Sequence, residues 1–177
     1  MARRRYFRYY PRTRVAKKKW ATNYKTIECS NSGSTLYKYE VLCENKAQSG
    51  TPTPVILKAG NFKIQGDCSV SNPSPSTLGI LYLRVFVLYV PEGWAMANLG
   101  AIVTDHPEWI MAWSAVDLPV TNAAQSSGGN KFSLSSRLKR NLNSGDKIVF
   151  YIDPTVTSSD NAVIHVLGAA QYWTCAN

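Results

Sequence analysis

A period-two alternation of apolar and polar side chains indicates β-strands in two segments of this chain. Every second position between residues 36 and 43 is aromatic or apolar, namely Tyr37, Tyr39, Val41 and Cys43, and residues 62–68 alternate in the same way. Successive side chains of a strand point to opposite faces, so this pattern is typical of strands with one buried face. Both segments are therefore predicted to be strands.

The segment LGILYLRVFVLYV, residues 78–90, is apolar at both parities. A central strand buried on both faces has this pattern, and so does a strand whose outer face meets another subunit. A buried helix is the alternative, but the β-branched and aromatic residues and the Pro91-Glu92-Gly93 stop favour a strand. If Arg84 in its middle is buried, it needs an acidic or carbonyl partner, and we expect a pairing role across a subunit interface.

The remaining segments predict more strands separated by turns. Further strands are expected at residues 109–118, 147–153 and 162–174. Residues 132–142 place Phe132, Leu134, Leu138 and Leu142 on one face of a strand, although the four-residue leucine spacing also fits a helix. Roughly seven to nine strands and no convincing helix predict an all-β sandwich or barrel.

The irregular segments carry clear turn signals. Residues 101–104 fit a short strand, and His106-Pro107-Glu108 fits a turn or a single helical turn. Asn143-Ser144-Gly145-Asp146 has the composition of a hairpin turn. Loops are expected at residues 50–55, 71–77 and 123–129, which are rich in proline, glycine, serine or threonine.

Residues 1–20 hold the whole net charge of the chain. Their nine cations are Arg3, Arg4, Arg5, Arg8, Arg12, Arg14, Lys17, Lys18 and Lys19, and they contain no acidic residue. The other 11 of the 20 Lys and Arg are matched by 11 Asp and Glu, so the formal charge of +9 belongs to this segment. We call residues 1–20 the arm and residues 21–177 the body. A cationic arm on a neutral body indicates a polyanionic partner, nucleic acid before an anionic membrane surface.

Aromatic rings alternate with the cations of the arm, and these rings are Tyr6, Phe7, Tyr9, Tyr10 and Trp20. Cations bind phosphates with release of counterions, arginine adds bidentate contacts, and flat rings stack on unpaired bases. All these cations and rings are therefore candidate contacts to a single-stranded nucleic acid. The Arg-Arg-Arg and Lys-Lys-Lys runs also fit a nuclear localisation signal. The alternative is a solvated tail that only aids solubility, a role that acidic residues usually serve better.

The arm has few aliphatic residues, and Pro11 would interrupt a helix. We expect it to be extended or disordered until it binds a polyanion or lies against the inside of an assembly. It also imitates a mitochondrial transit peptide, but its proline, its aromatics and the lack of an amphipathic stripe count against one. No apolar run follows it as in a secretory signal, and residues 78–90 are shorter than the about 20 residues of a membrane span. A soluble protein without membrane insertion is expected.

Few residues suit catalysis or metal binding. The chain has only two histidines, and Asp105, His106 and Glu108 fit a turn that caps a short helix at least as well as a metal site. His165 is expected to be a core or interface residue. The four cysteines are widely spaced and lack a CxxC pair, so we expect reduced, mostly buried thiols and no zinc site. The SSGGNK segment at 126–131 lacks the spacing of a phosphate loop. We predict no catalytic residue, no metal and no cofactor.

Five segments in order resemble the capsid proteins of circovirus-like viruses, which have circular single-stranded DNA genomes and encode a replication initiator. They are MARRRYFRYYPRTR at the start, RVFVLYVPEG at 84–93, HPEWIMAW at 106–113, SSRLKRNLNSGDKIVFYID at 135–153 and GAAQYWTCAN at 168–177. Together these segments and the regions they bracket cover most of the chain. The chain is shorter than typical circovirus coats, which indicates shorter surface loops.

The resemblance implies a viral jelly roll of eight strands in two four-stranded sheets, with the basic arm attached to it. It implies a homo-oligomer of about sixty copies that forms a T=1 icosahedral shell, with the arms turned inward onto a single-stranded DNA genome. RNA is the alternative cargo. It further implies host nuclear import machinery as a partner, and the virion and the host nucleus as locations.

These features together predict a non-enzymatic capsid protein that self-assembles and packages single-stranded DNA through its arm. A first alternative is a non-viral β-barrel protein that binds single-stranded nucleic acid. A second is an extracellular β-sandwich or lectin whose tail binds acidic polysaccharide, against which the missing signal peptide and unpaired cysteines count.

Overall fold

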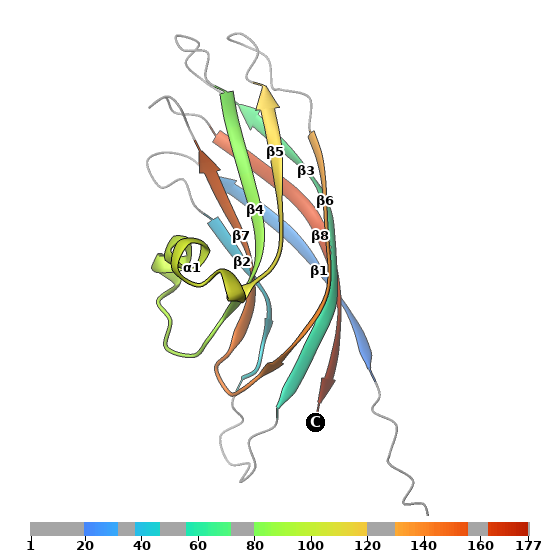
Figure 1. The fold of residues 1–177 in the computed structure, drawn as a ribbon. Coiled ribbons are helices and arrows are strands. Elements are labelled where there is room, and N and C mark those ends of the chain that lie inside the picture. Colours follow the sequence, from blue (N-terminus) through green and yellow to red (C-terminus); the bar gives the residue numbers. More distant parts are fainter. Residues whose placement is uncertain are drawn as a thin grey trace, which may run out of the picture.

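Eight β-strands run through the described part of this computed structural model, which comprises residues 20–31, 38–46, 56–71, 80–119, 130–155 and 163–176. The strands are β1 (Ala21–Asn31), β2 (Lys38–Glu44), β3 (Leu57–Ser71), β4 (Ile80–Val90), β5 (Ile110–Pro119), β6 (Asn130–Leu142), β7 (Lys147–Thr155) and β8 (Val163–Ala176). Between β4 and β5 lie the 3-10 helix η1 (Met96–Asn98), the α-helix α1 (Leu99–Asp105) and the 3-10 helix η2 (Pro107–Trp109). Figure 1 shows the strands as two layers with α1 outside them.

The order of the strands identifies the fold. One sheet has the order β1-β8-β3-β6 and the other has the order β2-β7-β4-β5, and all neighbours are antiparallel. Apart from β4 and β5, every two consecutive strands lie in different sheets, so the chain crosses repeatedly between the layers (Figure 1). This is the strand order of a jelly roll. The prediction of an all-β jelly-roll sandwich with eight strands in two four-stranded sheets is confirmed.

The core lies between the sheets because alternate side chains of each strand point inward. In β6, Phe132 and Leu134 are buried while Lys131, Ser133 and Ser135 beside them are exposed. The ring of Phe132 stacks on Phe150 of the opposite sheet, with the centroids 6.0 Å apart. Burying side chains of this size stabilises the fold by about 1.5–3 kcal/mol each. The predicted alternation therefore reflects one shared core between the layers.

Strand β4 is buried on both faces by parts of its own chain. Val85 and Val87 point into the core between the sheets. Phe86 and Leu88, on the outer face, pack in a second apolar cluster with Leu99 and Ile102 of α1. Of the two explanations for the two-sided pattern, a central strand buried on both faces is therefore the correct one over this part of β4. The strand assignment is also confirmed against the helical alternative.

A turn does connect β6 to β7 at residues 143–146, and Asp146 organises it, but the expected hairpin is wrong because the two strands lie in different sheets. Its buried carboxylate accepts hydrogen bonds from the backbone N–H of Asn143 at 2.8 Å, the backbone N–H of Glu92 at 2.9 Å and the hydroxyl of Tyr89 at 2.8 Å. Gly145 has a φ of 84°, which a residue with a side chain rarely adopts. The turn is thus held by a buried acceptor as well as by its glycine.

Two expectations about secondary structure are wrong. Residues 101–104 belong to helix α1, because Leu99 and Ile102, three apart, face the outer side of the sheet together. Residues 132–142 form strand β6 throughout, so the helical alternative is also wrong. The expected helical turn at His106-Pro107-Glu108 is confirmed by η2.

Leu138 does not share a face with Phe132 and Leu134, as the sequence pattern predicts. Ser136 pairs with Phe62 and Lys139 with Gly60, so β6 has two residues where β3 has one. This is a β-bulge, and it turns Leu138 outward, where 52% of its surface is exposed. Asn61, the opposing residue, has a φ of 53°. The alternation thus shifts within one strand.

The expected first and last residues of the strands and loops can be compared with those in the structure. Residues 21–31 form β1, which was not expected, and β3 extends beyond residues 62–68 at both ends. The expected loops at 50–55 and 123–129 lie outside the described residues, as do residues 36–37 and 72–77. The strands expected at 109–118, 147–153 and 162–174 match β5, β7 and β8 within two residues at each end.

Candidate nucleic-acid interface

Trp20 is the one candidate nucleic-acid contact of the arm that the structure describes. The other candidates, Arg3, Arg4, Arg5, Tyr6, Phe7, Arg8, Tyr9, Tyr10, Arg12, Arg14, Lys17, Lys18 and Lys19, lie outside the described residues. Trp20 directly precedes β1 and is half-buried. Nζ of Lys139 lies 5.2 Å from the centroid of its indole ring, a cation–π contact.

This contact places Trp20 over the outer face of the sheet β1-β8-β3-β6. Lys139 is on β6, which is at the other edge of the sheet from β1. In the register of the sheet, Thr22, Trp173, Gly60 and Lys139 form one row across the four strands. A Cβ on Gly60 would lie 2.7 Å from Cγ of Lys139, so the lysine stem lies over the glycine. The missing side chain leaves room for the lysine to reach toward Trp20.

The neighbouring row also contains an aromatic ring and a lysine. It runs through Tyr24, Gln171, Lys63 and Ser135. Tyr24 is 76% exposed, and its hydroxyl accepts a hydrogen bond of 3.3 Å from Nε2 of Gln171. We call these two rows together with Trp20 the arm-side face. Its rings and ammonium groups suit the stacking of bases and the binding of phosphates.

Acidic residues lie farther along the same outer face. The row of Glu28, Leu167, Asp67 and Lys131 is two rows beyond Tyr24. Among the described residues, the arm-side face itself holds lysine cations and no carboxylate. The end of the sheet where the arm attaches is thus the end suited to a polyanion.

The basic cluster Arg137, Lys139 and Arg140 is divided by the bulge in β6. Lys139 belongs to the arm-side face, whereas the guanidinium of Arg140 donates a hydrogen bond to the backbone oxygen of Glu108 and lies 5.6 Å from the ring centroid of Tyr89. Arg137 is exposed. The three residues are close in the sequence, but the structure places Lys139 and Arg140 on opposite sides of the strand.

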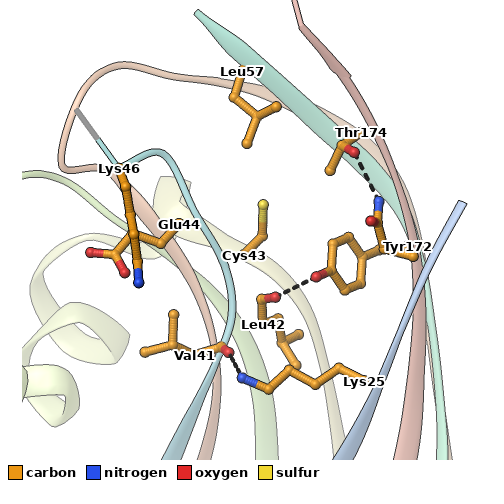
Figure 2. Close-up of a pocket in the computed structure, with 10 residues that line it drawn as sticks. Lys25, Val41, Leu42, Cys43, Glu44, Lys46, Leu57, Tyr172 and Thr174 are labelled. Carbon is orange, nitrogen blue, oxygen red and sulfur yellow. Dashed lines mark hydrogen bonds between the residues drawn. The ribbon is translucent and has the colours of Figure 1, made fainter. Parts of the chain in front are cut away.

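A pocket of about 480 Å³ opens between the sheets at their β1 and β2 edges (Figure 2). Nζ of Lys25 forms an ion pair of 2.7 Å with Glu40 and donates a hydrogen bond to the backbone oxygen of Val41. The hydroxyl of Tyr172 donates a hydrogen bond of 2.6 Å to the backbone oxygen of Leu42. These polar groups hold the two sheets together at this edge.

The thiols of the structure are unsuited to nucleophilic chemistry. All four cysteines are buried, which confirms the expected burial, and Cys29, Cys43 and Cys68 are free thiols. Burial raises the pKa of the Cys43 thiol, which lines the pocket, to about 11, and the Glu44 carboxylate adds to this effect. Burial likewise raises the pKa of Cys68 to about 12. A thiol acts as a nucleophile when it is ionised, so these two remain protonated near neutral pH.

His106 joins a cluster of aromatic rings at the end of α1. Its imidazole stacks on Trp109 with the centroids 4.0 Å apart and meets Trp94 edge-on at 5.4 Å. Its Nδ1 lies 3.1 Å from Oε1 of Glu108. The turn explanation for these residues is therefore correct, and the residues that the structure describes contain no group of three metal ligands. His165 was expected to be a core or interface residue; it is exposed on β8, so the core position is wrong and the interface position stays a prediction.

Sequence reasoning missed Tyr24 and Trp173 on the arm-side face. The signal in β1 is weak because its outward positions, Thr22, Tyr24 and Thr26, alternate with the polar Asn23 and Lys25. Trp173 lies in a segment predicted to be a strand, but its face depends on the pairing of β8 with β1 and β3. Only the register places these rings beside Lys139.

No helix in the described residues is long and apolar enough to cross a membrane. No protein-family model and no curated protein match the chain. A structure of infectious bursal disease virus, Gt strain, is 8% identical with a TM-score of 0.33, covering 89% of this chain and 33% of the matched chain. The T13 IBDV viral particle is 9% identical with a TM-score of 0.29, covering 88% and 39%.

The chain spans between a third and two-fifths of the length of these matched chains. Because the identities and TM-scores are low, nothing about function follows from them. The jelly roll is shown by the order and direction of the strands.

Proposed function

We propose that this chain is a viral capsid subunit whose body self-assembles into a small icosahedral shell and whose arm binds single-stranded DNA. The observation that carries the proposal is the division of charge: the formal +9 belongs to the arm, and the arm joins a neutral jelly roll. Jelly rolls of eight strands occur in viral capsids, and also in lectins and cupins. The arm distinguishes the capsid role, because a protein that packages a genome needs many cations per copy.

The arm-side face supports the nucleic-acid part of this proposal. Trp20, the last residue of the arm, contacts Lys139 over the outer face of the sheet β1-β8-β3-β6. The arm therefore joins the body beside Tyr24 and Trp173, whose rings are exposed. Exposed rings beside lysines are the combination that binds single strands with little sequence preference.

A shell of about sixty copies would carry roughly 540 positive charges on its arms, enough to neutralise a substantial part of a small genome. The arms act from the inner side of the shell in this proposal, and the runs of arginine and lysine serve host nuclear import before assembly. The chain then resides in the virion and, during assembly, in the host nucleus. Nothing in this role requires catalysis or a cofactor.

Electron microscopy of the purified full-length protein tests the proposal. Uniform particles about 20 nm across, with nucleic acid inside that nuclease does not reach, are expected for sixty domains of this mass. Digestion of the extracted nucleic acid with DNase and RNase distinguishes DNA from RNA. A protein that stays monomeric or dimeric at every salt concentration, yet binds single strands, would instead be the non-viral binding protein.

A charge-neutral arm separates packaging from folding. Replacing the nine arginines and lysines of the arm with glutamine is expected to leave the fold intact and remove the packaged nucleic acid. The matched control replaces the exposed Lys38 and Lys46 of the body with glutamine. This control variant should still package nucleic acid. Particles of the neutral-arm variant that keep their full nucleic-acid content would contradict the proposal.

A further inference from the structure

Each sheet ends in two edge strands, and β5 is the least protected of the four. Natural proteins place charges on edge strands to prevent pairing with other chains. The edges β1, β2 and β6 each carry at least two charged residues, among them Lys25, Glu40 and Lys139. Strand β5 has no charge from Ile110 to Val116, and its one charged residue, Asp117, is near its end. An edge of this kind accepts another strand.

The side chains of β5 indicate a contact surface as well. Trp113 is 62% exposed on the outer face of the sheet, next to the buried Phe86 of β4. Helix α1 covers the neighbouring Leu88, but its apolar cluster does not include Trp113. Tryptophan on a rigid strand is among the residues that most often dominate a protein interface.

The backbone of β5 has hydrogen-bonding groups directed to the open edge. The side chain of Asn130, on β6 of the other sheet, donates a hydrogen bond of 2.7 Å to the backbone oxygen of Asp117. Because this donor comes from beyond the edge, that oxygen points away from β4. Alternate residues of a strand share this direction, so the backbone groups of Ala115 and Trp113 also face the edge.

Space for a further strand lies along this edge. A groove of about 510 Å³ is lined by Ser114, Ala115, Val116, Asp117, Asn130, Lys131, Phe132 and Ser133. It borders the half of β5 that holds Ala115 and the first residues of β6. An added strand would therefore meet free space beside β5 rather than a packed core.

We propose that β5 pairs in antiparallel fashion with β5 of a second copy of this chain, across a two-fold axis at Ser114. In this register Trp113 of each copy lies opposite Ala115 of the other copy. The interface therefore contains two equivalent pairs, each of a large and a small side chain. The edge-facing N–H and C=O groups of these residues exchange hydrogen bonds. This inference deepens the proposed function, because it names one contact between assembling copies.

Charge favours a second copy at β5 over a second copy at β6, the edge strand whose charges are all positive. A two-fold pairing through β6 would bring Lys131, Arg137 and Lys139 of one copy near those of the other, whereas the β5 pairing brings together uncharged segments. The body as a whole has equal numbers of acidic and basic residues, so two bodies approach without net repulsion.

Cross-linking of full-length Ser114→Cys tests the register. The two Ser114 residues form a pair without mutual backbone bonds, whose Cα atoms are about 4.5 Å apart, which is within the range for a disulfide. Mild oxidation with oxidised glutathione should convert most of this variant to a covalent dimer that dithiothreitol reverses. The matched control, Ser135→Cys on the exposed face of β6, should remain monomeric on a denaturing gel. The native cysteines are all buried.

A second variant checks that the edge forms the contact. Ala115→Lys, added to Ser114→Cys, places a charge opposite Trp113 and should abolish the dimer while circular dichroism shows an intact fold. Equal cross-linking of Ser114→Cys and Ser135→Cys, or no dimer from either, would overturn the pairing. If Ser114→Cys forms shells but no cross-linked dimer, the β5 pairing is wrong and the proposed capsid function is not affected. If it forms the cross-linked dimer but never forms shells, the proposed capsid function is wrong and the β5 pairing is not affected.

Discussion

The indole ring of Trp20 lies 5.2 Å from Nζ of Lys139, although the two residues belong to opposite edges of one sheet. The contact spans the outer face of β8 and β3, and Gly60 makes room for it. It joins the cationic arm to one face of the neutral body, beside the exposed Tyr24. The last residue of the arm thus lies against the sheet β1-β8-β3-β6 and not against the other sheet.

Trp20 and Lys139 should contribute to nucleic-acid binding in different ways. Trp20→Ala should weaken single-strand binding by about 1–3 kcal/mol through the loss of a stacked base, with little change in salt dependence. Lys139→Gln should reduce the slope of log affinity against log salt concentration by about 1. Fluorescence anisotropy with a labelled oligonucleotide at several salt concentrations measures both, and Lys38→Gln on the other sheet is the control. An unchanged affinity in Trp20→Ala would contradict the role of this ring.

Arg84 forms an ion pair with Asp153 on the adjacent strand of its own sheet, so its acidic partner lies in the same chain and not across a subunit interface. Among the described residues, Nε of Arg84 is buried and has no hydrogen-bond partner. The guanidinium also lies 5.9 Å from the ring centroid of Phe86, which is a cation–π contact. The side chains are 40% and 24% exposed, so solvent screens the pair and we expect a coupling of about 1 kcal/mol.

A double-mutant cycle measures this coupling. Arg84→Met, Asp153→Asn and the double variant are compared by urea unfolding with the wild type. The control cycle uses Lys147 and Glu44, whose ion pair is longer at 3.5 Å, and its coupling should be smaller. A coupling at Arg84 and Asp153 no larger than in the control would show that the pair adds no stability.

Asp146 should be among the residues most sensitive to substitution. Asp146→Ala leaves the backbone N–H groups of Asn143 and Glu92 and the hydroxyl of Tyr89 without their acceptor, which should cost about 3 kcal/mol of unfolding free energy. Asp146→Asn keeps one acceptor oxygen and should cost less. Thermal and urea unfolding measure the loss, with the exposed Glu28→Gln as the control. A loss in Asp146→Ala no greater than in the control would contradict this role.

Buried thiols should make the fold sensitive to alkaline pH. Burial raises the pKa of Cys43 from 9.0 to about 11, so the folded state keeps its proton after the unfolded chain has lost it. The stability that this group contributes is therefore complete below pH 9 and is lost as the pH rises through 11, by about 3 kcal/mol in all. Urea unfolding under reducing conditions at pH 7 to 10.5 should show this decline.

Cys43→Ala identifies the contribution of that thiol. The variant should be less stable than the wild type at pH 7, where the cavity it leaves dominates, but its stability should fall less steeply above pH 9. Cys68→Ala is the companion variant, because burial raises the pKa of Cys68 to about 12. Identical slopes above pH 9 in the wild type and both variants would contradict the assignment of the alkaline decline to these thiols.

The strand character and most strand positions could be predicted from the residue pattern, whereas the two four-stranded sheets were implied only by the family resemblance. Alternation at residues 62–68 and 132–136 reports which side chains of a strand meet the core, and this depends on the two-residue repeat of the strand alone. The turn at Asn143-Ser144-Gly145-Asp146 could be predicted because its residue types suit one backbone conformation. The division into a cationic arm and a neutral body is likewise a property of composition.

Three other features depended on contacts between distant residues. The sequence of residues 101–104 allows a strand, but the outer face of β4 selects a helix because Leu99 and Ile102 bury Leu88. Leu138 continues the leucine repeat, yet the bulge opposite Asn61 turns it outward. The sequence around Arg84 does not identify Asp153 as its partner, because only the pairing of β4 with β7 brings the two residues together.

The sequence by itself determined that this is a chain of strands with a separate cationic segment, because side-chain alternation and charge are local properties. The tertiary structure decided which face of the body the arm joins and that the strand with the fewest charges, β5, lies at an edge. Both depend on register: β6 must pair with β3 for Lys139 to reach Trp20, and β5 must end its sheet for Trp113 and Ala115 to face an open edge. Register is set by the packing of the whole core, which no single segment contains.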